Sequence, residues 1–459
     1  MSQFLSIDVG STYCKGALFS PRGGLLRLDS KVTVPTTPDY LPSGVCSLLE
    51  KLKLSSTSLK SIETVWSSSA KGGLRVVALG IVPELTSKMA REVACSAGAK
   101  IVADYNYKIT VEDLECINKV APDILLLTGG TDGGNEDILL HNAEVLKDLN
   151  CDIPVIYAGN RAVRPKIREM FFRHQLHITD NVLPDMEHPN PLPARNEIGK
   201  IFIEQIVKGK GLQEIIDMIG SNPLPTPYSL LEFIRKSNEN DKVANFCVID
   251  LGGATTDFYS CCKAMNNSGV ILRGLREPDI KRTVEGDIGM RVSAKAASEV
   301  AHDYIVRQLE MLNRHYADFE HYVEKINLQP DALPETEQEI EFDRILATSC
   351  VVIATERHAG RRRKVYTVNG QVEVQTGKDL SGIALIIGTG GYLSGQNADF
   401  MKQAIADVLP HERDESYLMP RNPEFRFDQS YLLPLLANAS RLFPEAAVNT
   451  FNEMFLKET

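Results

Sequence analysis

Apolar runs alternate with helix-period segments through residues 74–157, and this alternation predicts an α/β region. In the helix-period segments, apolar residues recur every three or four positions. The expected strands are 74–82, 100–105, 123–127 and 153–157, and the expected helices are 84–97 and 111–120. Strands that alternate with helices form right-handed parallel β-α-β units. We therefore expect an α/β insertion around residues 70–165.

A second pattern occurs twice, with the two copies 242 positions apart. Each copy is a short apolar strand, an Asp, a glycine-rich bend and a second strand of alternating apolar residues. The copies span Phe4–Phe19 and Phe246–Ser260, and Asp8 and Asp250 take the same place in each. Strands around a glycine-rich bend are typical of a β-hairpin. A duplicated lobe is the simplest explanation.

The chain length agrees with two large lobes, because 459 residues correspond to roughly three average domains. We place the first lobe at residues 1–240, with the insertion inside it, and the second lobe at 241–459. Each lobe is expected to carry a mixed sheet that begins with the repeated hairpin. The predicted fold class is therefore α/β, with two lobes and duplicated hairpin-led mixed sheets.

Composition narrows the class of protein. The 50 Lys and Arg residues against 60 Asp and Glu give a net charge of −10, which disfavours nucleic acid and anionic membranes as partners. No apolar run approaches the roughly 18 residues of a membrane span, and Asp8 interrupts the apolar start where a signal peptide needs an unbroken run. The nine cysteines are scattered without a C-x-x-C pair. We expect a cytoplasmic protein with reduced thiols.

The two glycine-rich bends predict a phosphate-binding cleft. A bend without bulky side chains can direct several backbone N–H groups at one phosphate. Two bends across a cleft would hold the β- and γ-phosphates from opposite sides, while Asp8 and Asp250 bind Mg²⁺ through its waters or orient the attacking nucleophile. One bend alone would equally suit a plain hairpin. The bend residues are Gly10, Ser11 and Thr12 in the first copy, and Gly252, Gly253, Ala254, Thr255 and Thr256 in the second.

A third glycine cluster, Gly388, Thr389, Gly390 and Gly391, follows the apolar run 383–387. Adenosine can lie flat against a backbone of this kind, because side chains there would collide with the base. Taken alone, the cluster is explained as well by a strand-to-helix turn. Its place after two phosphate hairpins favours contact with the adenosine of ATP or ADP.

The order of these motifs resembles the actin, Hsp70 and sugar-kinase superfamily of ATPases, which has a ribonuclease H-like fold. The resemblance rests on the hairpins at Asp8 and Asp250, on Thr128–Asn135 and on the Gly388–Gly391 cluster, so it spans nearly the whole chain. It implies that Mg-ATP binds between the lobes and that ATP hydrolysis drives a conformational cycle.

Narrower motifs resemble the glutamate mutase accessory family, of the GlmL or MutL type, which is unrelated to mismatch-repair MutL. These motifs are Asp8–Lys15, Ser68–Arg75, Gly129–Asn135 and Arg282–Arg291. The resemblance implies an ATP-dependent accessory protein that exchanges damaged cobalamin in an adenosylcobalamin-dependent mutase or aminomutase. Cys14 departs from the threonine expected in that family, and a small residue there leaves the site intact.

Several residues keep two interpretations. Lys15 could reach a β-phosphate as a point charge, or it could be an exposed strand lysine. The superfamily implies a water-positioning role for Asp132 or Asn135, whereas a glycine-rich surface turn would also contain Asp and Asn. Asp287 is expected as a helix N-cap rather than a ligand. The prolines of 222–228 predict a connector.

Two further segments concern partners. The basic run Arg361–Lys364 precedes a predicted hairpin at 365–374 with its turn at Asn369-Gly370, and is either a solvated charged run or a docking site for an acidic surface. Residues 74–130 resemble a cobalamin-binding flavodoxin-like domain without its D-x-H-x-x-G motif, or form a generic β-α-β insertion.

Together these features predict an ATPase that acts on a protein client, namely the subunits of an adenosylcobalamin-dependent mutase. The alternatives are a small-molecule kinase on the same fold and a nucleotide-dependent scaffold protein. A kinase needs a substrate pocket and a positioned base, and no sugar- or carboxylate-binding motif is evident. The identity of the mutase, a homo- or hetero-oligomeric state, and any contact with cobalamin stay open.

Overall fold

The structure is a computed structural model of the chain. It describes residues 3–37, 39–55, 59, 61–69, 74–207, 211–238, 245–263, 269–368, 370–396, 400, 402 and 415–456. The chain divides into two compact units: unit 1 contains Met1–Ala70 and Lys210–Thr459, and unit 2 contains Lys71–Gly209. Three predictions lie outside the described residues, namely the lobe boundary at 240 and 241, residues 70–73 of the Ser68–Arg75 motif, and Asn369 of the predicted turn.

Sheet I of unit 1 is built on the first predicted hairpin, with strand order β3-β2-β1-β4-β10. The pairs β1–β2 and β2–β3 are antiparallel, while β4 is parallel to β1 and β10 is parallel to β4. The strands are β1 (Phe4–Val9), β2 (Tyr13–Arg22), β3 (Leu25–Pro35), β4 (Glu63–Ser68) and β10 (Leu224–Pro225). Helix α1 (Leu41–Lys51) packs on β2 and β3, and α8 (Leu212–Ile219) packs on α1.

The predicted connector at 222–228 is wrong in part. It contains β10 and the beginning of helix α9 (Thr226–Asn238). Prolines are tolerated here because β10 is an edge strand, where a missing N–H does not interrupt the ladder, and because Pro227 lies in the first turn of the helix, where N–H groups have no intrahelical partner.

Sheet II of unit 1 repeats the same order around the second hairpin, as β14-β12-β11-β17-β19. Again two antiparallel pairs lie on one side of the first strand and two parallel pairs on the other. The strands are β11 (Phe246–Leu251), β12 (Thr256–Cys261), β14 (Ile280–Glu285), β17 (Leu385–Thr389) and β19 (Glu424–Phe427). This duplicated order confirms the predicted fold class of hairpin-led mixed sheets.

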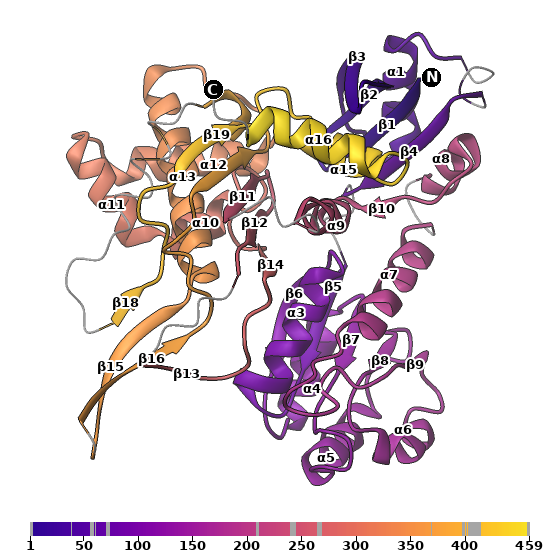
Figure 1. Ribbon diagram of the computed structural model, residues 1–459, viewed down its shortest axis with the longest axis vertical. Coiled ribbons are helices and arrows are strands. Elements are labelled where there is room, and N and C mark those ends of the chain that lie inside the picture. The colour runs from indigo at the N-terminus through magenta and orange to yellow at the C-terminus, as the bar shows by residue number, and fades with distance from the viewer. Residues whose placement is uncertain are drawn as a thin grey trace. The chain divides into compact units, whose positions relative to one another are not determined.

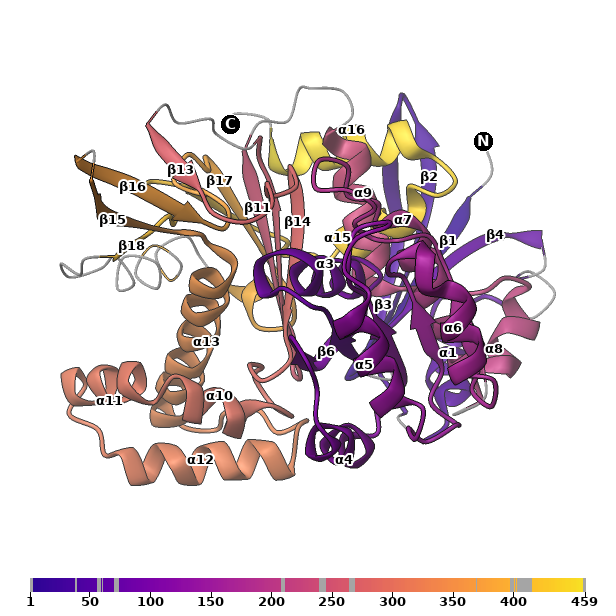
Figure 2. The same cartoon turned by 90° about the horizontal axis from the view of Figure 1, so that it is seen from below.

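One helix, α13, packs on one face of sheet II, and three further helices pack on α13 (Figure 2). The four helices are α10 (Ala294–Val300), α11 (His302–Met311), α12 (Tyr316–Leu328) and α13 (Glu337–His358). Residues of α13 and of β11 and β12 share one apolar core, which fixes the second hairpin from behind. Among the described residues, no helix of either unit has the length and apolar character that crossing a membrane requires.

The opposite face of sheet II shares a core with sheet I. Helices α9, α15 (Leu433–Ala439) and α16 (Pro444–Phe455) fill the space between the two sheets (Figure 1). Phe451 of α16 lies 5.6 Å from Phe233 of α9 and 5.7 Å from Phe246 of β11, measured between ring centroids. Phe4 of β1 packs on Phe443 at 5.0 Å. The two hairpins are therefore held by one continuous apolar core.

A small third sheet carries the basic run. Its order is β13-β16-β15-β18, and β15 and β16 form the predicted hairpin, which begins earlier than expected and includes the basic residues. Arg361 lies 4.5 Å from the Tyr417 ring centroid, and Arg362 bonds Asp379 at 3.2 Å. Two of the four basic residues thus have structural contacts. The strands are β13 (Val270–Leu272), β15 (Arg361–Thr367), β16 (Gly370–Thr376) and β18 (Glu415–Tyr417).

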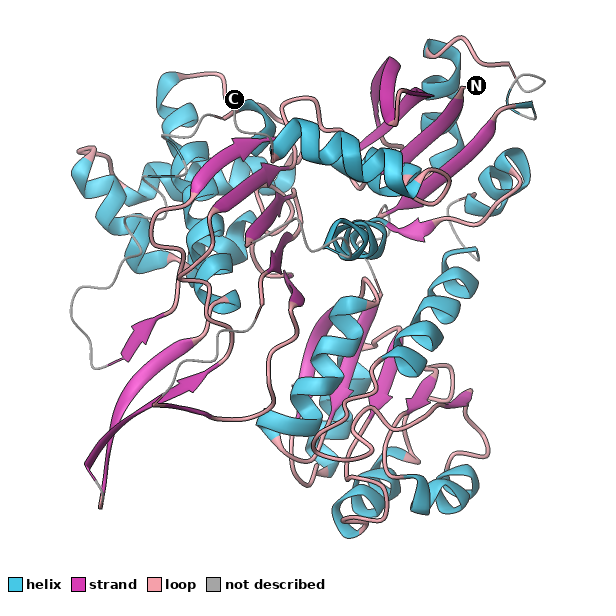
Figure 3. Ribbon diagram, viewed as in Figure 1, coloured by secondary structure: helices cyan, strands magenta, loops and turns pink. Residues whose placement is uncertain are grey.

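Unit 2 is a parallel α/β domain with strand order β6-β5-β7-β8-β9. Helices lie on both faces of its sheet, with α4, α5 and α6 on one face and α3 and α7 on the other (Figure 3). The strands are β5 (Arg75–Leu79), β6 (Lys100–Tyr105), β7 (Ile124–Leu127), β8 (Val155–Tyr157) and β9 (Leu176–Ile178). The helices are α3 (Lys88–Ser96), α4 (Val111–Val120), α5 (Asp137–Leu146), α6 (Arg164–Met170) and α7 (Leu192–Val207).

This order is that of flavodoxin-like sheets, whose ligands bind where the order reverses, here between β5 and β7. In unit 2 the loops themselves fill that position. A Cβ on Gly80 would lie 2.4 Å from Ser87 N, and one on Gly129 would lie 2.7 Å from the Ile81 side chain. Thr128 Oγ1 donates to the Leu79 carbonyl at 2.8 Å. The glycines that follow β5 and β7 therefore serve close packing between loops.

Candidate functional site

The first hairpin bend is closed by its own backbone. Gly10 N–H donates to the Tyr13 carbonyl at 3.0 Å, and a Cβ on Gly10 would lie 2.7 Å from that oxygen, so glycine is required. Thr36 donates its hydroxyl to the Gly10 carbonyl at 2.8 Å and its N–H to the Thr12 carbonyl at 2.9 Å. Within the described residues, the N–H groups of Ser11 and Thr12 at the apex have no backbone acceptor.

The second bend repeats this closure. Gly252 N–H donates to the Thr255 carbonyl at 2.9 Å, and a Cβ on Gly252 would lie 2.9 Å from the same oxygen. The carbonyls of Gly252 and Gly253 accept the N–H groups of Met290 and Arg291 at 3.0 and 2.8 Å. These bonds leave the N–H groups of the bend from Gly253 to Thr255 without backbone acceptors, as far as the structure describes the chain.

The two bends face each other within unit 1. A Cβ placed on Gly253 would lie 3.6 Å from Thr12 Oγ1 and 3.6 Å from Arg291 Cβ. Arg291 is fixed by two bonds of 2.9 Å to the carboxylate of Asp343. The two predicted bends thus lie close to each other, whereas a phosphate site between them stays a prediction.

The two predicted carboxylates end the first strands of the hairpins. Asp8 is buried, with 1% of its surface exposed. Its Oδ1 accepts the Thr226 hydroxyl at 2.7 Å and the Ser67 hydroxyl at 3.2 Å. Asp250 is paired across β11 and β12 with Asp257. Burial and, secondarily, the nearby carboxylate of Asp257 raise the pKa of Asp250 to about 7.

Lys15 supplies positive charge at the same place. It pairs with Asp8 across β1 and β2, and its Nζ lies 3.1 Å from the centroid of the Tyr431 ring. Burial lowers the pKa of Lys15, and the charges of Asp8 and Asp250 oppose that shift. Of its two interpretations, the structure thus disfavours a solvent-exposed strand lysine, while contact with a phosphate stays a prediction.

Asp257 carries a buried ion pair that the sequence reasoning missed. Arg282 Nε donates to Asp257 Oδ1 at 2.9 Å, and the two side chains are 1% and 8% exposed. Arg282 opens the Arg282–Arg291 motif, whose last residue buttresses the second bend. A charged pair on adjacent strands thus lies directly behind Asp250.

The third glycine cluster is used largely for packing. A Cβ on Gly388 would lie 2.8 Å from the Phe427 ring, and one on Gly390, whose φ is +102°, would lie 2.2 Å from the Leu251 carbonyl oxygen. Thr389 is buried and donates its hydroxyl to Asp428 at 3.1 Å. Within this cluster only Gly391 borders open space, because a Cβ there would have nothing within 4 Å among the described residues. Adenosine contact therefore remains a prediction that rests on Gly391 and the backbone around it.

A comparison of Gly390→Ala with Gly391→Ala tests whether Gly390 is needed for packing while Gly391 is not. We expect Gly390→Ala to lose about 1–3 kcal/mol of stability from its backbone conformation alone, with a further loss from the contact with Leu251. Gly391→Ala is expected to unfold as the wild type does, because its position is open. Thermal unfolding of both variants and their affinity for ADP would be measured. Equal stability of the two variants would contradict the packing role of Gly390.

Asp428 and Tyr431 also belong to this region, and sequence reasoning missed both. The Asp428 carboxylate accepts the N–H groups of Leu432 and Leu433 at 2.7 and 2.8 Å, at the beginning of α15. Burial raises the pKa of Asp428. Lys31 of β3 donates to the Ser430 carbonyl. The segment 428–431 thereby joins the loop after β17 to sheet I beside Lys15.

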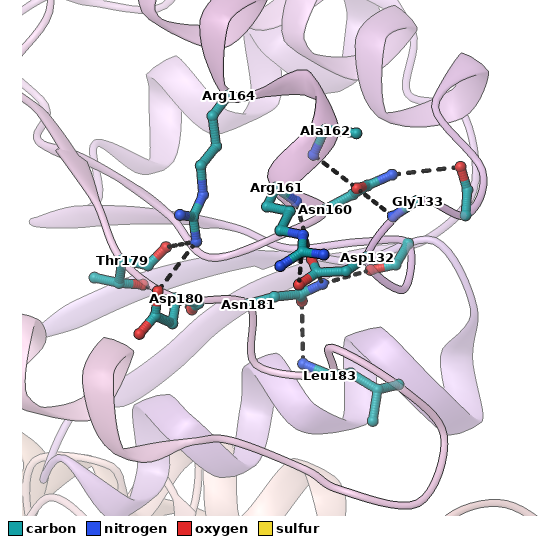
Figure 4. Close-up of polar contacts among 12 residues, drawn as sticks. Asp132, Gly133, Asn160, Arg161, Ala162, Arg164, Thr179, Asp180, Asn181 and Leu183 are labelled. Carbon is teal, nitrogen blue, oxygen red and sulfur yellow. Dashed lines mark hydrogen bonds and ion pairs between the residues drawn. The ribbon is translucent and has the colours of Figure 1, made fainter.

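Asp132 and Asn135 lie in unit 2, and both have structural contacts there; Figure 4 shows those of Asp132. Asp132 Oδ1 accepts Arg161 N–H at 2.9 Å and Asn181 Nδ2 at 3.0 Å, so it joins the loops after β7, β8 and β9. Asn160 bridges the N–H groups of Gly133 and Ala162, each at 2.9 Å. These bonds are those expected of a glycine-rich turn. A water-positioning role for Asp132 stays a prediction.

Asp287 is not a helix N-cap. Its carboxylate bonds the Arg357 guanidinium at 2.7 and 2.9 Å, and Glu285 bonds the same guanidinium at 2.7 Å. The following helix begins at Ala294, with Ser293 at the N-cap position. Asp287 therefore joins the strand β14 to the end of α13.

Mg²⁺ is compatible with the carboxylates of the site. Among the described residues, no group of three or more His, Cys, Asp or Glu side chains could hold a metal ion. Mg²⁺ usually binds one or two carboxylates and completes its coordination with water and substrate phosphates. Asp8 and Asp250 are the two carboxylates predicted for this role, which stays a prediction, and a nucleotide would have to supply the remaining ligands.

Comparisons with known proteins agree on the family. A family model described as MutL protein matches residues 4–455. Protein MutL of Clostridium tetanomorphum is 35% identical over 470 residues, which cover 100% of both chains. The chain belongs to the MutL protein family. The resemblance carried by Asp8–Lys15 and Arg282–Arg291 is thereby confirmed.

Solved structures are more distant from this MutL family member. The activator of the 2-hydroxyisocaproyl-CoA dehydratase from Clostridium difficile, with bound ADPNP, is 10% identical, with a TM-score of 0.30 and 100% of both chains covered. A ligand-bound xylulose kinase from Lactobacillus acidophilus is 11% identical, with a TM-score of 0.34 and coverage of 100% and 93%. The fold class therefore rests on the order of the chain's own sheets.

Proposed function

We propose that this MutL family member is an ATP-dependent accessory protein that reactivates an adenosylcobalamin-dependent mutase, such as glutamate mutase or an aminomutase. One observation carries the ATP-dependent part: two glycine bends face each other beside Asp8, Asp250 and Lys15, and within the described chain their apex N–H groups have no backbone acceptor. Family membership supports the accessory part. The proposed setting is the cytoplasm, where the nine free cysteines would stay reduced.

In this proposal the two bends hold the terminal phosphates of ATP. N–H groups at Ser11 and Thr12 would contact one side, and those from Gly253 to Thr255 the other. Lys15 would turn from Tyr431 toward a β-phosphate oxygen. Bound Mg²⁺ would neutralise developing charge on the phosphates.

Asp250 suits the orientation of an attacking water. Its pKa of about 7 allows it to be ionised at neutral pH and to accept a proton from that water. Asp8 is held by two hydroxyls, so it suits a fixed Mg²⁺–water contact. Hydrolysis would then change the distance between the bends and so the relation of the two sheets, which is how ATP could act on a client.

The test is reactivation of a mutase. Holo-mutase inactivated by turnover would be incubated with this protein, Mg-ATP and fresh adenosylcobalamin. We expect mutase activity to return with ATP and to stay low with a non-hydrolysable analogue, because only hydrolysis cycles the protein between two states. Mutase activity and phosphate release would be followed together.

Two controls separate the alternatives. The Asp250→Asn variant should bind nucleotide yet fail to reactivate the mutase. Reactivation that is indifferent to nucleotide would favour a scaffold protein, and rapid phosphorylation of a compound in a metabolite panel would favour a kinase. Either result would overturn the proposed function.

A further inference from the structure

Two hydroxyl groups donate to Asp8, one from a residue that precedes unit 2 in the sequence and one from a residue that follows it. Ser67, near the end of β4, precedes the first residue of unit 2, Lys71. Thr226, at the start of α9, follows the return of the chain from unit 2. The Ser67 and Thr226 hydroxyls are 3.2 and 2.7 Å from the same oxygen, Asp8 Oδ1.

The strand that carries Ser67, β4, is hydrogen-bonded to β10, the strand that leads into Thr226. In sheet I, Leu224 pairs with Ser67 and Pro225 pairs with Ser68. The chain thus leaves for unit 2 after β4, re-enters unit 1 at Lys210, forms α8, and then forms β10 directly beside β4. Ser67 is fully buried and Thr226 is 6% exposed, so water does not readily replace Asp8 as the hydrogen-bond partner of either hydroxyl.

A second layer fixes the direction of the Ser67 hydroxyl. Asn438 of α15 donates its Nδ2 to Ser67 Oγ at 2.8 Å and to the Ile7 carbonyl at 2.9 Å. Because Ser67 Oγ accepts from Asn438, its own proton is free to point at Asp8. Asn438 Oδ1 in turn accepts the Ser229 hydroxyl at 2.8 Å, which assigns the orientation of the amide. The network is buried and joins β4, α9 and α15 around one carboxylate.

We propose that Ser67 and Thr226 are positioning residues for Asp8, and that they transmit the state of unit 2 to ATP hydrolysis. This rests on the proposed function, since it requires Asp8 at the site of hydrolysis. A displacement of β10 relative to β4 moves the two hydroxyls apart, and Asp8 cannot keep both bonds. A client that binds unit 2 and restrains the chain where it enters and leaves this unit, near Lys71 and Gly209, would therefore change the orientation of Asp8 and the rate of ATP hydrolysis.

Kinetics of the full chain test the positioning role. Thr226→Val keeps the shape of the side chain and removes its hydroxyl, and Ser67→Ala does the same for the other donor. We expect each to lower kcat for ATP hydrolysis on the order of tenfold, with KM changed less than about twofold. Thr226→Ser, which keeps a hydroxyl, is expected to restore kcat.

Matched controls remove buried hydroxyls that only bond their own helix. Thr355 is fully buried and donates to the Val351 carbonyl at 2.6 Å, and Ser237 is 1% exposed and donates to the Ile234 carbonyl at 2.8 Å. Thr355→Val and Ser237→Ala should keep wild-type kcat. Thermal unfolding of all variants would show whether a lower kcat reflects a loss of fold.

The outcomes separate this proposal from the proposed function. Wild-type protein that hydrolyses no ATP would overturn both. Activity in the wild type and its loss in Asp8→Asn, combined with unchanged kcat in Thr226→Val and Ser67→Ala, would overturn the positioning role alone.

The proposed transmission from unit 2 to Asp8 is tested separately, by the change in kcat for ATP hydrolysis when a client is added. With saturating holo-mutase as the probe, we expect the kcat of wild-type protein for ATP to change severalfold. In Ser67→Ala the same addition should leave kcat within about twofold of its own value, while co-sedimentation with the mutase persists. An equal response in wild type and variant, or no response in the wild type, would overturn transmission.

Discussion

Asp250→Asn is expected to hydrolyse ATP more slowly by a factor on the order of 100 or more, with nucleotide affinity within about tenfold of the wild type. The asparagine keeps the size of the side chain and loses the charge that would orient water or Mg²⁺. Asp8→Asn should have a similar effect. Phosphate release under single-turnover conditions and equilibrium binding of ADP would measure the two quantities. Near wild-type turnover in either variant would contradict the phosphate-site assignment.

The same variant, Asp250→Asn, also tests the pH dependence of ATP hydrolysis. Because the pKa of Asp250 is raised to about 7, the wild-type rate should fall about tenfold for each pH unit below 7 and level off above it, whereas Asp250→Asn should show no such limb. The raised pKa means that folding disfavours the ionised form, so its stabilising contribution is present at low pH and is lost as pH rises through about 7. Asp250→Asn should therefore be at least as stable as the wild type at pH 8.

Arg282→Leu is expected to lower the free energy of unfolding by about 3–5 kcal/mol. Removing the guanidinium leaves the Asp257 carboxylate, which is 8% exposed, as an unpaired buried charge. The same charge raises the pKa of Asp250, so loss of Arg282 should also shift the pH dependence of hydrolysis to higher pH. Urea unfolding would measure the first effect and pH–rate profiles the second.

Two variants control for this effect. A double substitution, Asp257→Asn with Arg282→Gln, removes both charges and should recover most of the lost stability. Arg27→Leu breaks an exposed pair with Glu453, at 3.7 Å and with side chains 58% and 39% exposed, so it should change stability by less than about 1 kcal/mol. If Arg27→Leu and Arg282→Leu lowered the free energy of unfolding equally, burial would not explain the contribution of the Arg282–Asp257 pair.

The hairpins were predictable because their signal is local. Asp8, the bend at Gly10 and the alternating strand after it lie within a few residues, and the second copy repeats the spacing. Six elements of unit 2 were predictable for the same reason, since their periodicity is contained in each segment: β5, β6, β7, β8, α3 and α4. The elements α5, α6, β9 and α7 were not predicted.

The residues that hold the site were not predictable from these patterns. Thr226 and Asn438 bond Asp8 and Ile7 of the first hairpin from more than 200 positions away, and Thr and Asn are common in every environment. Glycine clusters were a poor guide as well. A glycine that follows a strand is required equally when a ligand or another loop approaches, and Gly390 and Gly129 are approached by the chain itself.

The shared core of unit 1 has a consequence for biosynthesis. Unit 2 is continuous in sequence, so it can fold on the ribosome as soon as Gly209 has emerged. Phe4 and Ser6 must wait for the end of the chain, because Phe4 packs on Phe443 and Ser6 donates to the Leu435 carbonyl at 2.8 Å. The nascent protein therefore carries a finished domain between two halves of an unfinished one. A chain that stops before Leu435 lacks both of these contacts, so we expect it to leave the first hairpin, and with it the proposed phosphate site, unformed.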